Sequence, residues 1–214
     1  MELSTATRRA PGRPRDEALQ QRRRTEILDC AVRVFAKHGY QQTDVQVIAD
    51  DVGISKGSVY RYFESKEGLF LAAVRRGVQE LFDTIDARLA AVQDGLETLS
   101  LAVSVYIEFF QRRPELTELF VQERATFRER RLPVFFDMRD ARRDRWVRIV
   151  KRLISECRVR KIPPARLLDV LGNALYGTMF TNHFIGNRKP VHVQAAEIID
   201  VLFNGILVEK EVRR

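Results

Sequence analysis

The sequence predicts an all-α protein, and three observations support that prediction. Apolar residues recur at helical spacing in nearly every segment beyond the first twenty residues, as in "ILDCAVRVF" (27–35). Single glycines and prolines, such as Gly39, Gly53 and Pro114, separate these periodic segments. No segment has a convincing alternating pattern of a β-strand, and the sequence has no internal repeat.

Size, charge and cysteine content narrow the class of protein. The chain has 214 residues, 45% of them hydrophobic, which is enough for one large domain or two small ones. Its formal net charge of +8 favours an anionic partner: nucleic acid, an acidic membrane surface or an anionic ligand. Cys30 and Cys157 form no CxxC pair, and no run of 18 apolar residues occurs. We therefore expect a cytoplasmic protein without a membrane-spanning segment.

The N-terminal third begins with a basic segment and continues with short helices. Residues 1–20 are rich in arginine, proline and glycine and predict a flexible arm. A helix is expected from Arg22 to Gly39. Thr43 and Gln46 have the spacing of a capping box, so the next helix should begin at about residue 44 and end at Gly53.

Two serine caps and a series of longer helices should follow. Ser55 is a plausible N-cap for a helix over 56–63, and Ser65 for a longer helix over 66–92. Beyond residue 95 we expect helices over 96–113 and 115–131, one continuous helix over 134–158, and a final pair. That final pair covers 165–186 and 191–210.

The segment "VGISKGSVYRYF" (52–63) has the pattern of a helix-turn-helix, whose second helix enters the DNA major groove. A helical wheel puts Val59 and Phe63 on the core side. Gly57, Ser58 and Arg61 point the opposite way, and two tyrosines lie on the flanks. A glycine here lets the backbone come close to the duplex.

The longer segment "TDVQVIADDVGISKGSVYRYFESKEGLF" (43–70) resembles the DNA-binding signature of the TetR/AcrR family of transcriptional repressors. It follows a helix of the matching kind, "ILDCAVRVFAKHGY", so the resemblance covers roughly residues 22–71. Asp44 departs from it, because many relatives carry a neutral residue there. An acid in a first helical turn favours the helix dipole but repels a nearby phosphate.

The resemblance implies which residues contact DNA. Those facing bases or the groove wall are Lys56, Gly57, Ser58, Tyr60 and Arg61, and those holding phosphates are Thr43, Tyr62 and Lys66. Arg61 is a candidate for a bidentate contact with guanine, and the alternative is that it lies over a phosphate. The tyrosines have a plainer alternative as half-buried aromatics. The arm, with "RRAPGRPR" (8–15), is either a minor-groove hook or a basic tail that binds by counterion release.

The resemblance also implies that residues 21–68 form the DNA-binding domain and residues 69–214 a helical domain for dimerisation and effector binding. Apolar stripes support a homodimer: Ile198, Ile199, Leu202, Ile206 and Leu207 in one segment, and Leu168, Leu171, Leu175 and Met179 in another. Gly172 and Gly177 permit close approach of helices. The alternative is that these stripes belong to the intrachain core.

Aromatic residues supply material for an effector pocket, with an ordinary core as the alternative. The candidates are Tyr106, Phe109, Phe110, Phe120, Phe127, Trp146, Tyr176, Phe180 and His183. The arginine-rich stretch over 124–152 either attracts an anionic effector or, with its interleaved acids, forms a solvated face.

An enzyme is the main rival class, and the sequence argues against it. It lacks HExxH, GxSxG, P-loop and Rossmann patterns, and no Cys/His cluster suggests a metal. We therefore expect no catalytic residue, cofactor or metal. The sequence predicts a dimeric regulator that binds a palindromic operator in double-stranded DNA and is released by a small molecule. The alternative is a helical ligand-binding or oligomerisation protein without DNA binding.

Overall fold

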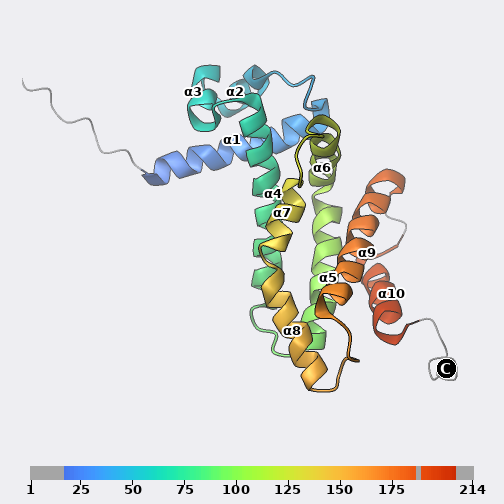
Figure 1. Ribbon diagram of the computed structural model, residues 1–214. Coiled ribbons are helices and arrows are strands. Elements are labelled where there is room, and N and C mark those ends of the chain that lie inside the picture. Colours follow the sequence, from blue (N-terminus) through green and yellow to red (C-terminus); the bar gives the residue numbers. More distant parts are fainter. Residues whose placement is uncertain (1–16, 187–188, 206–214) are drawn as a thin grey trace, which may run out of the picture.

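A computed structural model describes residues 17–186 and 189–205, and within these ranges the chain is all-α (Figure 1). Ten helices are described: α1 (Glu17–His38), α2 (Val45–Val52), α3 (Lys56–Phe63), α4 (Lys66–Leu89), α5 (Gly95–Arg112), α6 (Pro114–Thr126), α7 (Val134–Asp140), α8 (Arg143–Ser155), α9 (Pro164–Ile185) and α10 (Val191–Asn204). No helix in the described part of the chain is both long and apolar enough to cross a bilayer.

The helices α1 to α3 form a small domain at one end of the molecule, packed on the first turns of α4 (Figure 1). Phe35 of α1, Ile48 of α2, Val59 of α3 and Leu69 of α4 are each fully buried in a shared core. Gly53 ends α2 with a φ of 70°, a left-handed conformation that glycine adopts without a Cβ penalty. That turn sets the angle between α2 and α3.

The remaining helices form the body of the molecule (Figure 1). Its long axis is the pair α4 and α5, with α7 against α4, α8 against α5, and α9 and α10 on the other side of α5. Since α4 begins in the small domain and runs the length of the body, both regions share one continuous helix.

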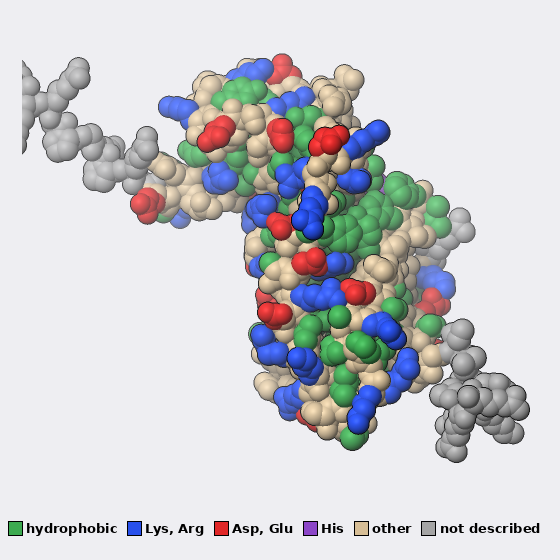
Figure 2. Space-filling model, in the orientation of Figure 1, with side chains coloured by type: hydrophobic (Ala, Val, Ile, Leu, Met, Phe, Trp, Pro, Cys, Tyr) green, Lys and Arg blue, Asp and Glu red, His purple; other side chains and the backbone are tan. Residues whose placement is uncertain are grey.

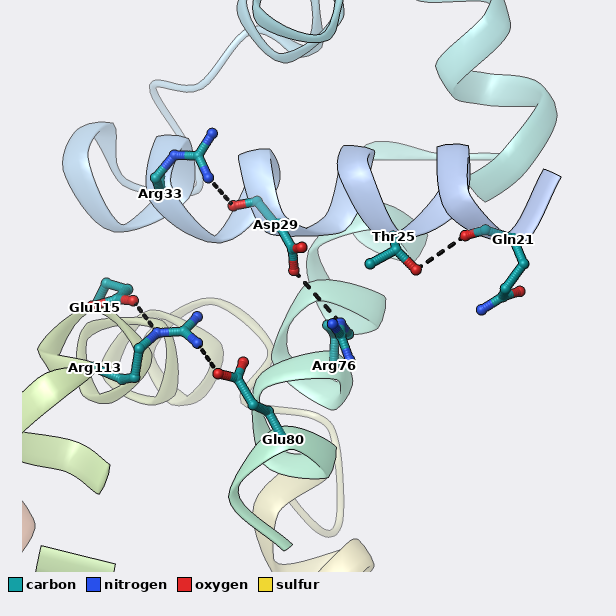
Figure 3. Close-up of polar contacts among 8 residues, drawn as sticks. All are labelled: Gln21, Thr25, Asp29, Arg33, Arg76, Glu80, Arg113 and Glu115. Atoms are coloured by element: carbon teal, nitrogen blue, oxygen red, sulfur yellow. Dashed lines mark hydrogen bonds and ion pairs between the residues drawn. The ribbon is translucent and has the colours of Figure 1, made fainter. Parts of the chain in front are cut away.

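Further contacts join the small domain to the body. The carboxylate of Asp29 on α1 lies 3.5 Å from the guanidinium of Arg76 on α4 (Figure 3). Within the body, Arg113, at the junction of α5 and α6, pairs with Glu80 of α4 and with Glu115 of α6 and so ties α6 to α4 (Figure 3). Phe127 at the end of α6 packs edge-on against Tyr40, with ring centroids 5.0 Å apart. The domain is therefore tied to α4 and α6 together.

The structure corrects three expectations about local structure. Helix α1 begins at Glu17, so residues 17–20 belong to a helix and not to the arm; the rest of the arm lies outside the described residues. The N-cap of α2 is Asp44, whose carboxylate accepts from the Gln46 amide, and not Thr43. The helix expected over 134–158 is two helices, α7 and α8, because the chain turns at 141–142.

Candidate DNA-binding surface and effector cavity

Helix α3 is short and is held in place by its caps and two buried side chains. Ser55 caps its start, its hydroxyl accepting from the Ser58 amide at 3.1 Å, as the sequence indicates. Val59 is fully buried and Phe63 is 5% exposed, so one side of the helix is anchored in the core. An isolated helix of eight residues is unstable in water, so this anchoring is what maintains it.

The other side of α3 faces solvent, as the helical wheel predicts. Gly57, Tyr60 and Arg61 are exposed, and Ser58 is half-buried. Arg61 donates from Nη2 to the hydroxyl of Ser58 at 2.8 Å, and that hydroxyl lies 2.9 Å from the hydroxyl of Ser55. These polar contacts stay within α3 and its cap, so the outer face of the helix remains a polar, accessible surface.

Lys56 begins α3 and contacts the start of α2. Its ammonium lies 2.6 Å from the carboxylate of Asp44, and both side chains are well exposed. The backbone hydrogen bond from Gln46, followed by the hydrogen bond from Lys56, lowers the pKa of Asp44. Asp44 therefore has two roles in the free protein: it caps α2 and it neutralises the first cation of α3.

The three residues predicted to hold phosphates lie in different environments. Thr43 is only 4% exposed and its hydroxyl donates to the Gly39 carbonyl at 2.7 Å, so its side chain serves the turn before α2, and a phosphate contact from it is not supported. Tyr62 is half-buried beside Phe63. Lys66 lies over the ring of Tyr40 and donates to the Gln41 carbonyl at 3.1 Å, near the surface.

Arg24 has a structural role that the sequence pattern does not indicate. The guanidinium of Arg24 on α1 lies 4.5 Å from the ring centroid of Phe63 and donates to the Tyr62 carbonyl at 3.1 Å. It therefore holds the C-terminal end of α3. The position of Arg24 in an arginine run gave no signal that distinguished it from its neighbours.

The body contains an apolar cavity of about 130 Å³ between α4, α5, α7, α8 and α9. Two of the aromatic candidates, Tyr106 and Trp146, line it. The other lining residues are Phe82, Ile85, Leu99, Ala102, Val103, Phe135, Arg139, Arg143, Leu168, Leu171, Gly172 and Leu175. The pocket predicted from the sequence consists of aromatics, so it lacks the aliphatic lining residues; it also lacks Phe82 and Phe135. Arg139 and Arg143 belong to the stretch over 124–152, for which attraction of an anionic effector is one of the two alternatives.

The two arginines are the charged groups of this lining. Arg139 donates to the carboxylate of Asp140 at 2.8 and 3.0 Å, and Arg143 donates to that of Asp169 at 2.8 Å. Both side chains are about one-third exposed. Gly172 lies beside Arg139, because a Cβ at that position would be 3.6 Å from the Arg139 Nη1 atom. An apolar cavity with two guanidinium groups suits a ligand with an apolar body and an acidic end.

The other aromatic candidates lie outside this cavity. Phe110 and His183 line a smaller one, of about 60 Å³, between α5, α6 and α9. Phe120 and Tyr176 border a third hollow beside α7, and Phe180 packs edge-on against Tyr176. Phe109 is 6% exposed in the core, and Phe127 packs against the small domain. Phe109, Phe127 and Phe180 line none of these three cavities, and their part in an effector pocket stays a prediction.

The residues expected at a dimer interface are largely packed within the chain. Leu171 and Met179 are buried, and Ile198, Ile199 and Leu202 are half-buried against α5 and α9; Ile206 and Leu207 lie outside the described residues. A different set is exposed: Val170 (55%), Phe184 (65%), Ile185 (55%), Val201 (54%) and Phe203 (39%). Apolar side chains also gather on the surface near α9 in Figure 2. Thus one face of α9 and α10 packs on α5, and apolar residues remain outside.

On the face that Figure 2 shows, basic side chains do not gather in a single patch. In Figure 2, lysine and arginine side chains are spread over both the small domain and the body, with acidic side chains among them. In the arginine-rich stretch, Arg145 and Arg152 lie outside the lining of the main cavity and pair with Asp86 and Glu156. The interpretation of this stretch as a solvated face with acidic partners is therefore supported for these residues.

These features define an all-α helix-turn-helix protein with a helical body that encloses an apolar cavity. Residues 27–73 match the family of bacterial regulatory proteins named tetR. The chain is 35% identical over 104 residues to the transcriptional activator FasR of Mycolicibacterium smegmatis, covering 49% of this chain and 45% of FasR. It is 34% identical over 113 residues to the transcriptional repressor KstR2 of Rhodococcus jostii, covering 49% and 55%. The chain thus spans about half the length of these curated relatives.

The fold extends the likeness to the body. The regulator FadR of Bacillus subtilis, solved in complex with stearoyl-CoA, superposes with a TM-score of 0.74 over 86% of this chain and 99% of that one, at 18% identity. At that identity the likeness concerns the fold. The motif, the family match over residues 27–73, the curated relatives and the fold agree, and together they indicate a regulator of the TetR family.

Proposed function

We propose that this protein is a cytoplasmic, DNA-binding regulator of transcription, most simply a repressor, in which residues 21–68 bind DNA and residues 69–214 dimerise and bind an effector. The observation that carries the proposal is the two-sided character of α3. Val59 and Phe63 anchor one side, while Gly57, Tyr60 and Arg61 lie exposed on the other. Packing of the chain does not require that polar face, and a major groove accepts such a helix.

The DNA contacts are assigned to particular side chains. Arg61 and Ser58 face base edges, Tyr60 lies against the groove wall, and Lys66 and Tyr62 are placed for phosphates. In the DNA complex, Lys56 either separates from Asp44 or approaches the DNA still paired with it, since Asp44 neutralises Lys56 in the free protein. Loss of that ion pair costs little, because both groups are exposed and solvent screens their attraction.

A dimer supplies the second α3 helix, which binds the second half-site of the operator. The apolar residues left exposed on α9 and α10 suit burial against a second copy of the chain. A two-fold dimer requires a near-palindromic operator with half-sites about one helical turn, or a multiple of it, apart.

We assign to the effector a long apolar portion and an acidic end. The main cavity is apolar apart from Arg139 and Arg143. Stearoyl-CoA, the ligand of the FadR structure, is of this chemical kind. Release from DNA follows if the ligand favours a body conformation that spreads or turns the two α3 helices.

Footprinting and gel shifts on the DNA upstream of the gene's own reading frame test DNA binding. We expect salt-sensitive, sequence-specific binding, which Arg61→Ala weakens by roughly 5- to 150-fold, the equivalent of about 1–3 kcal/mol per base contact. Arg88→Ala, a body arginine paired with Glu108, is the matched control and should bind as the wild type does. Unchanged specific affinity in both Arg61→Ala and Tyr60→Ala contradicts the assignment of α3.

Fluorescence tests the effector class, because the sequence has a single tryptophan and Trp146 lines the cavity. Titration with palmitate and with hexadecan-1-ol separates an acidic end from a neutral one on the same chain. We expect palmitate to change the emission at lower concentration, and Arg143→Gln to remove the difference. Equal responses to both compounds in the wild type would exclude a role for the arginines.

A further inference from the structure

Gln122 of α6 makes a buried contact from the body to the backbone of the small domain. Its side-chain Nε2 donates to the carbonyl of Phe35 on α1 and to Oε1 of Glu118, both at 3.0 Å. The residue is 9% exposed. Both partners are acceptors, so the amide must present its nitrogen to them, and the orientation of Gln122 is dictated by its surroundings.

The chain of contacts continues from Glu118 to α9. The second carboxylate oxygen of Glu118, Oε2, lies 3.3 Å from Nε2 of His183. Three side chains, His183, Glu118 and Gln122, therefore connect α9 through α6 to the last turns of α1. Such a network orders its members jointly, so moving one end changes the geometry at the other.

The His183 end lies next to the effector cavity. His183 lines the smaller cavity together with Met179 and Tyr106, and Tyr106 also lines the main cavity. The Tyr106 hydroxyl is buried and donates to Sδ of Met179 at 3.6 Å. Met179 and His183 are four residues apart on α9 and share a face. A ligand that moves Tyr106 therefore acts on the wall to which His183 belongs.

At the Gln122 end of this network, further hydrogen bonds connect α1 to the start of α3. The Phe35 carbonyl that accepts from Gln122 also accepts from the Gly39 amide at 2.9 Å. The Gly39 carbonyl in turn accepts from the amide and hydroxyl of Thr43, at 3.2 and 2.7 Å. The next residue, Asp44, caps α2 and pairs with Lys56 at the start of α3. The turn between α1 and α2 is thus bonded at both ends.

The arrangement leaves one buried group unsatisfied. The side-chain oxygen Oε1 of Gln122 is buried and has no hydrogen-bond partner among the described residues. A buried carbonyl oxygen without a donor is unfavourable. Gln122 is therefore held through its amide nitrogen alone, by its hydrogen bonds to the Phe35 carbonyl and to Glu118.

We propose that Gln122 is the positioning residue through which occupancy of the effector cavity, transmitted by His183 and Glu118, sets the turn between α1 and α2 and with it the angle of α3. The inference rests on the proposed function for its regulatory meaning. The coupling itself is a property of the free protein and is measurable without DNA or effector.

A double-mutant cycle read by hydrogen exchange tests the coupling in the full chain. His183→Leu is made in the wild type and in Gln122→Met, which removes the amide donors while keeping an unbranched side chain. We expect His183→Leu to speed exchange in segment 36–44 by roughly three- to tenfold, the range expected for one weakened hydrogen bond. In the Gln122→Met background the same change should add nothing, because the connection is already broken.

The matched control is Thr178→Val, which borders the same small cavity on α9 but bonds only within its own helix, to the Ala174 carbonyl. It should leave exchange in segment 36–44 unchanged. Should Gln122→Met fail to fold, Glu118→Ala replaces it, since the Glu118 side chain is 34% exposed and tolerates truncation.

Additive effects of His183→Leu and Gln122→Met, or an equal effect of Thr178→Val, overturn the proposal. Either result leaves the proposed function intact, because footprinting decides that separately. Conversely, the protein could show the coupling and yet bind no operator. The connection from His183 to segment 36–44 would then stand, and the regulatory role proposed for it would be excluded.

Discussion

Helix α3 and helix α9 leave opposite kinds of surface exposed. On α3 the buried side consists of Val59 and Phe63, and what remains outside is polar. On α9, which has 22 residues, only Leu171 and Met179 are buried, and Phe184 and Ile185 are left in solvent. The first surface suits a hydrated, charged partner such as DNA, and the second suits another protein surface. The two regions therefore divide the proposed function between them.

The largest expected effect comes from charging the apolar surface. Phe184→Asp combined with Val201→Asp puts two carboxylates where a dimer would bury apolar area, so the protein should sediment as a monomer of 24.8 kDa. Operator affinity should fall by at least about 100-fold, since the second half-site no longer binds in the same complex. Leu132→Asp, at another exposed apolar residue, should remain dimeric. A double variant that stays dimeric would place the interface elsewhere.

A second prediction concerns the packing of α4 against α6, between the small domain and the rest of the body. Gly77 of α4 lies against Leu116 of α6, where an added Cβ would overlap Cδ2 of Leu116 and lie 3.0 Å from Cδ1. Leu116 is fully buried, so α4 or α6 must move. Gly77→Ala should therefore lower the free energy of unfolding by about 1–3 kcal/mol, measured by urea denaturation. An unchanged urea midpoint would mean that the two helices separate without cost.

Gly57 offers a prediction of the opposite sign for stability. A Cβ at Gly57 would meet only the Ser55 hydroxyl, at 4.0 Å, so Gly57→Ala should stabilise the fold by up to about 1 kcal/mol. The same methyl group stands between the α3 backbone and the groove, and operator affinity should fall several-fold. Gel shifts and urea denaturation on one preparation measure both. Affinity that rises with stability would show that the backbone of α3 does not approach DNA closely.

The smallest effect is a pH dependence set by Glu123 in the body. Burial raises the pKa of Glu123, against the opposing hydrogen bond from the Val134 amide and the charge of Arg130. The folded state therefore holds this proton more tightly than the unfolded chain does. The contribution of Glu123 to the free energy of unfolding is fully present below the ordinary glutamate pKa. It is lost as pH rises through the raised pKa of the folded state.

Glu123→Gln should remove that part of the decline, because an amide does not titrate and its oxygen still accepts from Val134. Urea midpoints of both proteins across this pH range provide the measurement. Parallel pH profiles for wild type and variant would show that Glu123 keeps an ordinary pKa when folded.

The small domain was predictable from sequence because its signals are local. Ser55, Ser65 and Gly53 act on their own helix ends, and the two-residue anchor of α3 follows from helical spacing alone. The error over the cap of α2 is also local: Thr43 and Asp44 are both good caps, and burial of Thr43 against Gly39 decides between them.

The body was less predictable because its site is assembled from distant segments. Leu99, Phe135 and Leu171 meet in one cavity although nothing in their spacing relates them. The turn at 141–142 divides a stretch whose apolar spacing continues on both sides, so periodicity predicted a single helix. Pairing of Arg143 with Asp169 likewise depends on the placement of α8 and α9, whereas Arg139 pairs with its sequence neighbour Asp140.

Selection of binding sites from random-sequence DNA duplexes tests the central claim, that the outer face of α3 reads DNA. The wild type should enrich a two-fold symmetric motif, with half-sites about 10 base pairs or a multiple apart. Arg61→Ala should enrich a motif relaxed at one position in each half-site, and Arg88→Ala the unaltered motif. Failure of the wild type to enrich any sequence, or an identical motif from Arg61→Ala, would contradict the account.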